Sequence, residues 1–225
     1  RYFASGLLIL WIAVSIYLPL AMVLIGSFMK FFGMFGIEKP FTIQHWAAVL
    51  GDPAFTQALQ NSLILGFGVA GLGVVVYSVL GYLILRGRFV GRATLSLLVW
   101  IPWAIPGILL GLSLLWIFLS VRFFNFLYGT MFVLIFSVIL KDMPIGTQMF
   151  KAAFAQVTEE LEQASRVSGA GPFTTFRRIT VPLIAPMIVS IFVLVFMSSI
   201  RDISTPILLA TPATTPLSVL MLERS

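Results

Sequence analysis

Four charged residues lie inside or at the end of long apolar stretches, where charged side chains are unusual. Lys141 and Asp142 are adjacent within one stretch, and Arg201 and Asp202 follow another. Charges at such positions are costly and normally face a partner or an aqueous cavity. We therefore expect Lys141 and Asp142 either to line the path of a transported solute or to form an ion pair that only stabilises helix packing. For Arg201 and Asp202 we expect a place in the membrane interface, with contact to another protein as the alternative.

No catalytic or metal-binding constellation accompanies these charges. The sequence has no cysteine and a single histidine, His45, whose place beside Trp46 predicts a solvated side chain rather than a ligand. It contains neither a glycine-rich phosphate loop with Lys-Ser/Thr nor a His-Glu-x-x-His pattern. We therefore expect a protein that holds no metal or cofactor, has no catalytic residue and does not itself hydrolyse ATP.

The composition places these charges in a membrane. Of the 225 residues, 60% are hydrophobic and 10% are charged, and the mean hydropathy is +1.07. A soluble domain could not bury that much apolar surface. The net charge of +6 comes from short basic clusters between apolar runs. Since such clusters are a signal of membrane topology, nucleic acid is not expected as a partner.

Long runs without charge predict an all-α fold, a polytopic transmembrane helical bundle. A helix needs about 20 apolar residues to cross the hydrocarbon, and backbone groups in lipid must hydrogen-bond within the segment. We expect one transmembrane domain over residues 1–225, with a final span after Ser225 left open. The predicted spans lie near residues 7–28, 63–85, 94–120, 128–150 and 180–200.

A sixth run, residues 203–222, is as long as the others but contains three prolines. Each proline removes a backbone donor and disturbs the helical ladder. We predict a loop or re-entrant segment that packs on protein, and a kinked sixth span is the alternative.

Prolines and glycines also mark two of the predicted spans. Pro102, Pro106 and Gly107 interrupt the third run and predict a kink or a break. Because broken helices at membrane depth are tolerated where they line a cavity, these three residues join Lys141 and Asp142 as candidates for a translocation path.

The second span is rich in glycine. Gly68 and Gly81, with Tyr77 between them, predict a face that lets neighbouring helices approach closely.

The Lys and Arg residues are unevenly divided between the connections. With a cytoplasmic N-terminus, eight of them fall on the cytoplasmic side and four on the other, leaving Lys141 and Arg201 uncounted. This excess favours a cytoplasmic N-terminus. On the opposite side, the polar and aromatic stretch from Thr42 to Trp46 predicts a short interfacial helix.

The cytoplasmic connection over residues 151–178 reads as two helices joined by a turn. Thr158 is a good N-cap, and acidic residues follow it in the first turn, where the helix dipole favours them. Gly169 is suited to end that helix, and Pro172 to open the next. The second helix is expected to close near residue 178, and Pro182 to mark the start of the fifth span.

This connection resembles the EAA loop of binding-protein-dependent ABC importer permeases, whose pattern is Glu-Ala-Ala, three residues, Gly, nine residues and Ile-x-Leu-Pro. Gln163, Ala164 and Ser165 occupy the triplet, Gly169 falls at the expected spacing, and residues 179–182 read Ile-Thr-Val-Pro. The departures are Gln for Glu, Ser for the second Ala and Val for Leu. Because Gln163 carries no charge, these departures argue against a specific ionic contact at this position. They are compatible with the predicted helix. An ordinary amphipathic interfacial helix is the alternative.

The resemblance implies a type I importer permease in which this loop is a coupling helix seated in a groove of an ATPase subunit. It also implies several partners: two cytoplasmic ATPase subunits, which bind the ATP and Mg, a second permease subunit or fused half, an extracytoplasmic substrate-binding protein and membrane lipid. The implied coupling residues are Glu162, Gln163, Ala164, Ser165, Arg166, Gly169 and Pro182.

The implied location is the prokaryotic cytoplasmic (inner) membrane, and the implied activity is ATP-driven uptake. Residues 208–220 are similar to permeases for ferric iron, with permeases for polyamines, phosphonate or another oxyanion as alternatives. An ion-coupled secondary transporter is the rival hypothesis, favoured by Lys141, Asp142 and the broken third span. An intramembrane enzyme is a third hypothesis, although the sequence offers no credible pair of a catalytic nucleophile and a general base.

Overall fold

The computed structural model describes residues 2–31, 33, 36 and 39–224, without the side chains of residues 2–4, 159, 162, 166 and 172. Within this part of the chain the regular structure is helical, apart from one isolated bridge between Met29 and Phe41. The contacts divide the chain into two compact units, residues 1–56 and 57–225.

The first unit contains α1 (Tyr2–Ser27), α2 (Gln44–Leu50) and the start of α3 (Pro53–Arg86). The ring of Trp46 in α2 stacks on Phe28 with their centroids 5.9 Å apart, and its Nε1–H donates to Ser27 Oγ at 3.3 Å. The short helix predicted in this connection is confirmed, and these contacts hold it against the end of α1.

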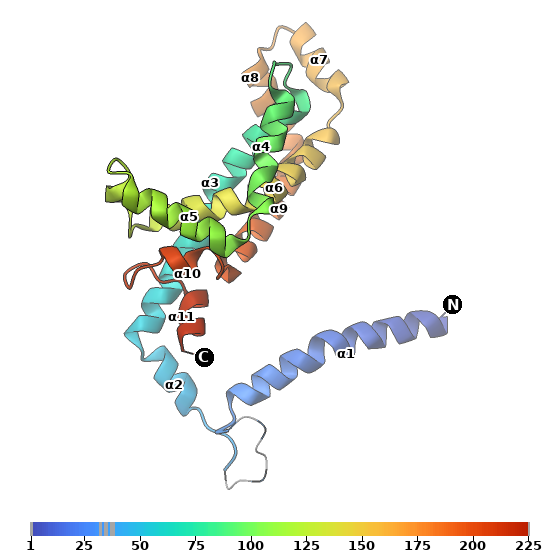
Figure 1. The fold of residues 1–225 in the computed structure, drawn as a ribbon. Coiled ribbons are helices and arrows are strands. Elements are labelled where there is room, and N and C mark those ends of the chain that lie inside the picture. Colours follow the sequence, from blue (N-terminus) through green and yellow to red (C-terminus); the bar gives the residue numbers. More distant parts are fainter. Residues whose placement is uncertain (1, 32, 34–35, 37–38, 225) are drawn as a thin grey trace. The chain divides into compact units, whose positions relative to one another are not determined.

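The second unit carries the remaining helices (Figure 1). They are the rest of α3, α4 (Arg92–Ala104), α5 (Gly107–Ser120), the 3₁₀ turn η1 (Asn125–Leu127), α6 (Met131–Ala155), α7 (Glu159–Val167), α8 (Pro172–Thr175), the π-helical turn η2 (Phe176–Thr180), α9 (Val181–Arg201), α10 (Pro206–Leu209) and α11 (Leu217–Glu223). Four helical stretches of the described chain are long and apolar enough to cross a membrane: residues 5–27, 53–86, 131–155 and 173–201. The bent pair α4 and α5 makes a fifth candidate.

The predicted break in the third span lies at Pro106. Helices α4 and α5 meet there at 105°. Proline disfavours the helical conformation of the residue before it, and Ile105 accordingly has φ −101° and ψ 123°. Pro102, by contrast, stays inside α4 and does not break it.

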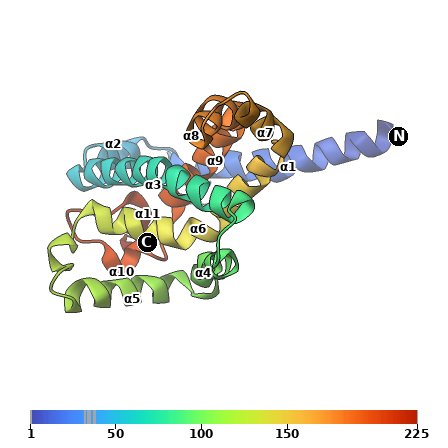
Figure 2. The same cartoon turned by 90° about the horizontal axis from the view of Figure 1, so that it is seen from above.

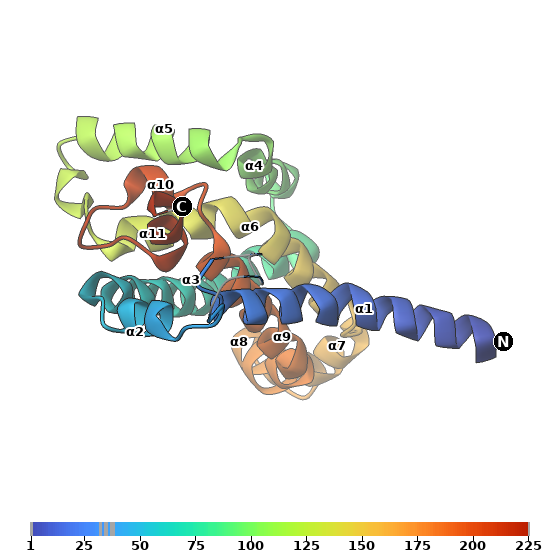
Figure 3. The same ribbon diagram turned by 90° about the horizontal axis from the view of Figure 1, so that it is seen from below.

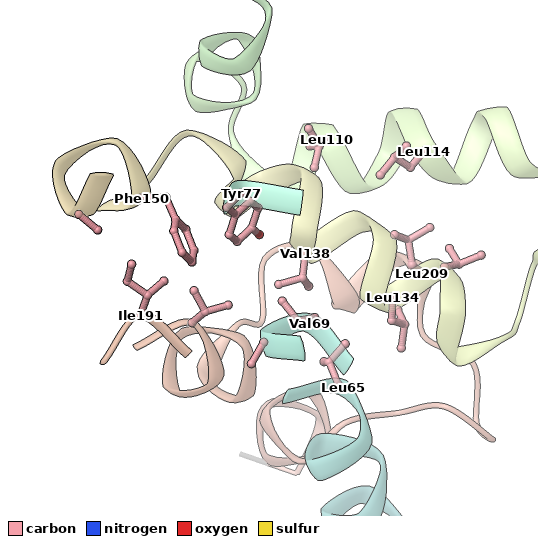
Figure 4. Packing of buried hydrophobic residues seen from close by; sticks show 14 of the residues in the cluster. Leu65, Val69, Tyr77, Leu110, Leu114, Leu134, Val138, Phe150, Ile191 and Leu209 are labelled. Carbon is pink, nitrogen blue, oxygen red and sulfur yellow. The ribbon is translucent and has the colours of Figure 1, made fainter. Parts of the chain in front are cut away.

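Close helix packing around the glycine-rich face of α3 forms the core of the second unit (Figure 4). A Cβ on Gly68 would lie 2.5 Å from Ile135 Cδ1 of α6, and one on Gly81 would lie 3.2 Å from the Lys151 backbone nitrogen. The predicted role of these glycines is confirmed. Tyr77 is fully buried between them, and its hydroxyl donates to the Ile139 carbonyl at 2.9 Å.

Residues 203–222 form a folded segment with two short helices, α10 and α11, as the three prolines predict. Helix α10 packs on both α5 and α6 (Figure 2 and Figure 3). The polar start of α3 holds the rest: Asn61 Nδ2 donates to the carbonyls of Ala213 at 3.0 Å and Thr215 at 3.1 Å, and Ser62 Oγ accepts from the Leu217 N–H at 2.7 Å. Helix α3 begins ten residues before the predicted span, and these two polar residues lie in that additional part.

Candidate functional site

The predicted two-helix connection is a compact hairpin, which we call the α7–α8 hairpin (residues 159–175). Helix α7 begins directly after Thr158. At its other end Gly169 adopts φ +85°, and the Ala170 N–H donates to the Ser165 carbonyl at 3.1 Å. This is a Schellman cap, in which glycine avoids the strain of a left-handed residue. Pro172 then opens α8, as predicted.

The base of the hairpin is fixed to the long helices. The ring of Phe176 meets Tyr82 of α3 edge to face, with centroids 5.2 Å apart, and Tyr82 meets Phe154 of α6 in the same way at 5.5 Å. Arg86 Nη2 donates to the Val157 carbonyl at 2.6 Å, just beyond the C-terminus of α6, where the helix dipole favours a cation. The α7–α8 hairpin therefore starts from a rigid platform, which the sequence pattern did not reveal.

The candidate coupling residues of α7 differ in orientation. The side chains of Gln163 and Ala164 are exposed, whereas Ser165 is half-buried and its Oγ lies 3.0 Å from Oγ1 of the buried Thr175. Ser165 thus joins the two arms of the hairpin. Glu162 and Arg166 lie outside the described side chains.

The predicted helix end near residue 178 is wrong, whereas Pro182 marks the start of α9 as predicted. Residues 172–201 form one helical stretch, in which η2 widens the turn just before Pro182. Proline has no N–H and its ring crowds the carbonyl four residues earlier, here Arg178, so a π-turn accommodates it without a break. Pro182 lies in the first turn of α9 rather than in the hairpin.

A second site lies halfway along α6, where Lys141 and Asp142 meet the end of α9. Lys141 Nζ lies 2.8 Å from Asp202 Oδ2 and 3.7 Å from Asp142 Oδ1. Ser198 Oγ donates to Asp142 Oδ2 at 3.2 Å, and Ser204 Oγ donates to Asp202 Oδ1 at 2.8 Å. We call these five residues the mid-span cluster.

Asp202 is the centre of the mid-span cluster, and its predicted place in the membrane interface is wrong. It is 7% exposed and ends α9 with an extended backbone. Its carboxylate accepts from the Ser204 N–H at 3.2 Å, which turns the chain back toward the bundle. Ser218 Oγ of α11 donates to the Asp202 carbonyl at 2.8 Å. Its ion pair with Lys141 is the interhelical alternative that the sequence left open.

The broken third span reaches the same place. A Cβ on Gly107, at the start of α5, would lie 2.5 Å from Ser204 Oγ. Of the predicted path residues, Gly107, Lys141 and Asp142 therefore gather around Ser204 and Asp202, and Pro106 precedes Gly107 at the break. Beside the cluster is an open recess of about 460 Å³. Sequence reasoning missed Ser198 and Ser204, since a single serine in an apolar run carries no distinctive signal.

Several long apolar helices, a broken span and a charged mid-span cluster define a multi-pass transport component of the membrane. Residues 72–224 match the family described as "Binding-protein-dependent transport system inner membrane component". The chain belongs to this family: it is a permease subunit of the ABC importer class and a multi-pass inner-membrane protein. This family is of another class than the rival hypotheses of an ion-coupled secondary transporter and of an intramembrane enzyme.

The relatives named for a solute differ among themselves. The chain is 28% identical over 171 residues to "Fe(3+)-transport system permease protein FbpB 2" of Haemophilus influenzae, covering 76% of this chain and 33% of that protein. It is 26% identical to "Molybdate/tungstate transport system permease protein WtpB" of Pyrococcus abyssi, covering 71% of this chain and 62% of that one. The chain thus spans about a third of the ferric relative.

The fold is that of solved importers. A crystal structure of a bacterial alginate ABC transporter in complex with an alginate pentasaccharide-bound periplasmic protein contains a chain with a TM-score of 0.70 and 21% identity. The match covers 95% of this chain and 77% of that one. An all-α permease fold, as predicted, is confirmed.

Proposed function

We propose that this chain forms one half of the translocation path of an ATP-driven importer and couples ATP hydrolysis by partner subunits to solute uptake. The observation that carries the proposal is the α7–α8 hairpin, a projecting element with a rigid base on α3 and α6. Because the aromatic contacts of Phe176 and the hydrogen bond of Arg86 leave little freedom at that base, a force on α7 is transmitted to the long helices.

The surface of the hairpin suits a protein partner. Large apolar side chains stand out from it: Leu161 is 47% exposed, Phe173 74% and Val167 90%. Such exposed apolar groups close together favour an interaction site. Ala164 and Gly169 add little side chain to hold a partner away, so we assign α7 to a groove of an ATPase subunit, with Gln163 at the contact.

The mid-span cluster is assigned to the translocation path. Its charges lie near the middle of α6, where a broken α4–α5 pair and the end of α9 converge, and such interruptions are typical of transporter binding sites. We further propose that the N-terminus and the hairpin face the cytoplasm, that a second permease domain completes the path, and that an extracytoplasmic binding protein delivers the solute.

Ferric iron is our first choice of solute, supported by residues 208–220 and by the name of the ferric relative. Oxyanions are the second choice, supported by the name of the molybdate/tungstate relative.

Substitution of Gly169 by tryptophan tests the coupling. The full permease is reconstituted with its ATPase subunits and binding protein, and ATP hydrolysis and solute uptake are measured together. A Cβ on Gly169 meets no atom within 4 Å, so the indole projects into the partner's groove. We expect solute moved per ATP hydrolysed to fall at least about tenfold, about 1.4 kcal/mol of lost coupling.

The matched control is Gly91→Trp. Gly91 also has a positive φ, +103°, and open space around it, but it lies in the turn before α4. A tryptophan at Gly91 therefore also faces the strain of a positive φ, but outside the hairpin. Unchanged coupling in Gly169→Trp, or an equal loss in both variants, would refute the assignment.

A further inference from the structure

Both carboxylates of the mid-span cluster are already engaged. Asp142 receives Ser198 on one oxygen and faces Lys141 with the other. Asp202 accepts from Ser204 on one oxygen and forms an ion pair with Lys141 through the other. In each carboxylate one oxygen therefore accepts a serine hydrogen bond and the other faces the shared Lys141 ammonium.

The cations of this region are more exposed than the carboxylate of Asp202. Lys141 keeps 22% of its side chain exposed, against 5% for Asp202. Arg201 is exposed, and among the described residues none forms a hydrogen bond or an ion pair with its side chain. Both cations line the open recess of about 460 Å³ together with Ser198 and Asp202, and Asp202 is already paired with Lys141. The lining therefore carries two cations and one carboxylate, and Arg201 is the charge there that is not paired within the cluster.

The depth of Arg201 makes its exposure informative. Its neighbour Asp202 touches Lys141, the eleventh of 25 residues in α6, so the end of α9 lies level with the middle of a span. A guanidinium at that depth must face water or an anionic partner. The recess has the volume of a small-molecule site, and guanidinium pairs bidentately with carboxylate, phosphate and other oxyanions.

From this arrangement we infer that Arg201, supported by Lys141, binds an oxyanion group of the transported solute. The permease then selects a solute that is an oxyanion or carries one, and iron would pass as a complex with a carboxylate or phosphate ligand rather than as the bare cation. This inference rests on the proposed function, because it assigns the recess to the translocation path.

The experiment uses the fact that this chain has no cysteine. Ser198→Cys places one thiol in the recess of the full permease, reconstituted with its partner subunits. Its labelling rates with an anionic methanethiosulfonate (sulfonatoethyl) and a cationic one (trimethylammonium) are each divided by the rate with a free thiol. We expect the anionic reagent to be favoured about tenfold, and molybdate or citrate, but not neutral trehalose, to slow the labelling.

A second substitution identifies the source of the preference. Arg201→Gln in the reporter protein should remove most of it, Arg201→Lys should retain most of it, and the control Arg122→Gln, an exposed cation in the turn after α5, should leave it unchanged. Equal rates for both reagents, an unaffected preference in Arg201→Gln, or no labelling because lipid or another subunit covers the recess would each overturn the inference. Labelling needs no ATP, so a failure of coupling would appear as lost uptake with the preference intact.

Discussion

The α7–α8 hairpin occupies 17 consecutive residues, 159–175. The mid-span cluster instead draws on α6, α9 and the segment after α9, and its residues Asp142 and Ser198 are 56 positions apart in the chain. The hairpin is shaped by local rules: a start after Thr158, a left-handed glycine and a proline. The cluster exists only because distant elements pack together. A substitution in the hairpin should therefore act locally, and one in the cluster should act on the whole second unit.

The largest effect is expected from Lys141→Met. Without the ammonium group, the two carboxylates of Asp142 and Asp202 remain at low exposure with no cation. Breaking such a pair costs about 3–5 kcal/mol. We expect a clear loss of thermal stability in detergent, followed by size-exclusion chromatography. Lys151→Met, a turn from the end of the same helix, is the control; equal stability of the two variants would contradict the structural role of the cluster.

A smaller effect, and a direct contrast between the two regions, comes from alanine at Gly107 and at Gly169. At Gly107 the new Cβ would lie 2.5 Å from Ser204 Oγ, so the folded segment of residues 203–222 must shift, at a cost of about 1–3 kcal/mol. At Gly169 it meets nothing, and the cost is the left-handed backbone alone, about 1 kcal/mol. Limited proteolysis should show new cleavage in residues 203–222 for Gly107→Ala only. Cleavage there in both variants would remove the contrast.

The same contrast explains what could be predicted from the sequence. The hairpin was predicted nearly to the residue, because caps and turn residues act over a few positions. The exception is the predicted helix end near residue 178, where the π-turn lets the helix continue into α9. The placement of Asp202 was wrong, because a charge next to the end of an apolar run has the same signature at an interface and at mid-span. Only the contact with Lys141 distinguishes the two locations, and this contact depends on the tertiary packing of α6 against the end of α9.

Substitution of Asn61 tests how the folded segment of residues 203–222 is held against α3. Its amide donates to two carbonyls, those of Ala213 and Thr215, and Asn61→Ala leaves the second without its donor, while Gln57 still reaches the first at 3.3 Å. We expect a loss of about 1–2 kcal/mol and faster hydrogen exchange in residues 211–217. Gln60→Ala, an exposed neighbour on α3, should change neither quantity; a similar change in both would show that the segment is held elsewhere.

The smallest effect is expected within the hairpin, from Ser165→Ala. The substitution removes the hydroxyl contact to Thr175, a side-chain hydrogen bond of 3.0 Å between the two arms that is worth about 0.5–1.5 kcal/mol. Because the aromatic base stays intact, global stability should not change, while hydrogen exchange in residues 165–175 should rise by up to about tenfold. Ser168→Ala loses only a bond within α7, to the Ala164 carbonyl, and serves as the control. A fall in global stability with Ser165→Ala would mean that the hairpin is coupled to the core as tightly as the mid-span cluster, and the distinction between a local and a distributed site would fail.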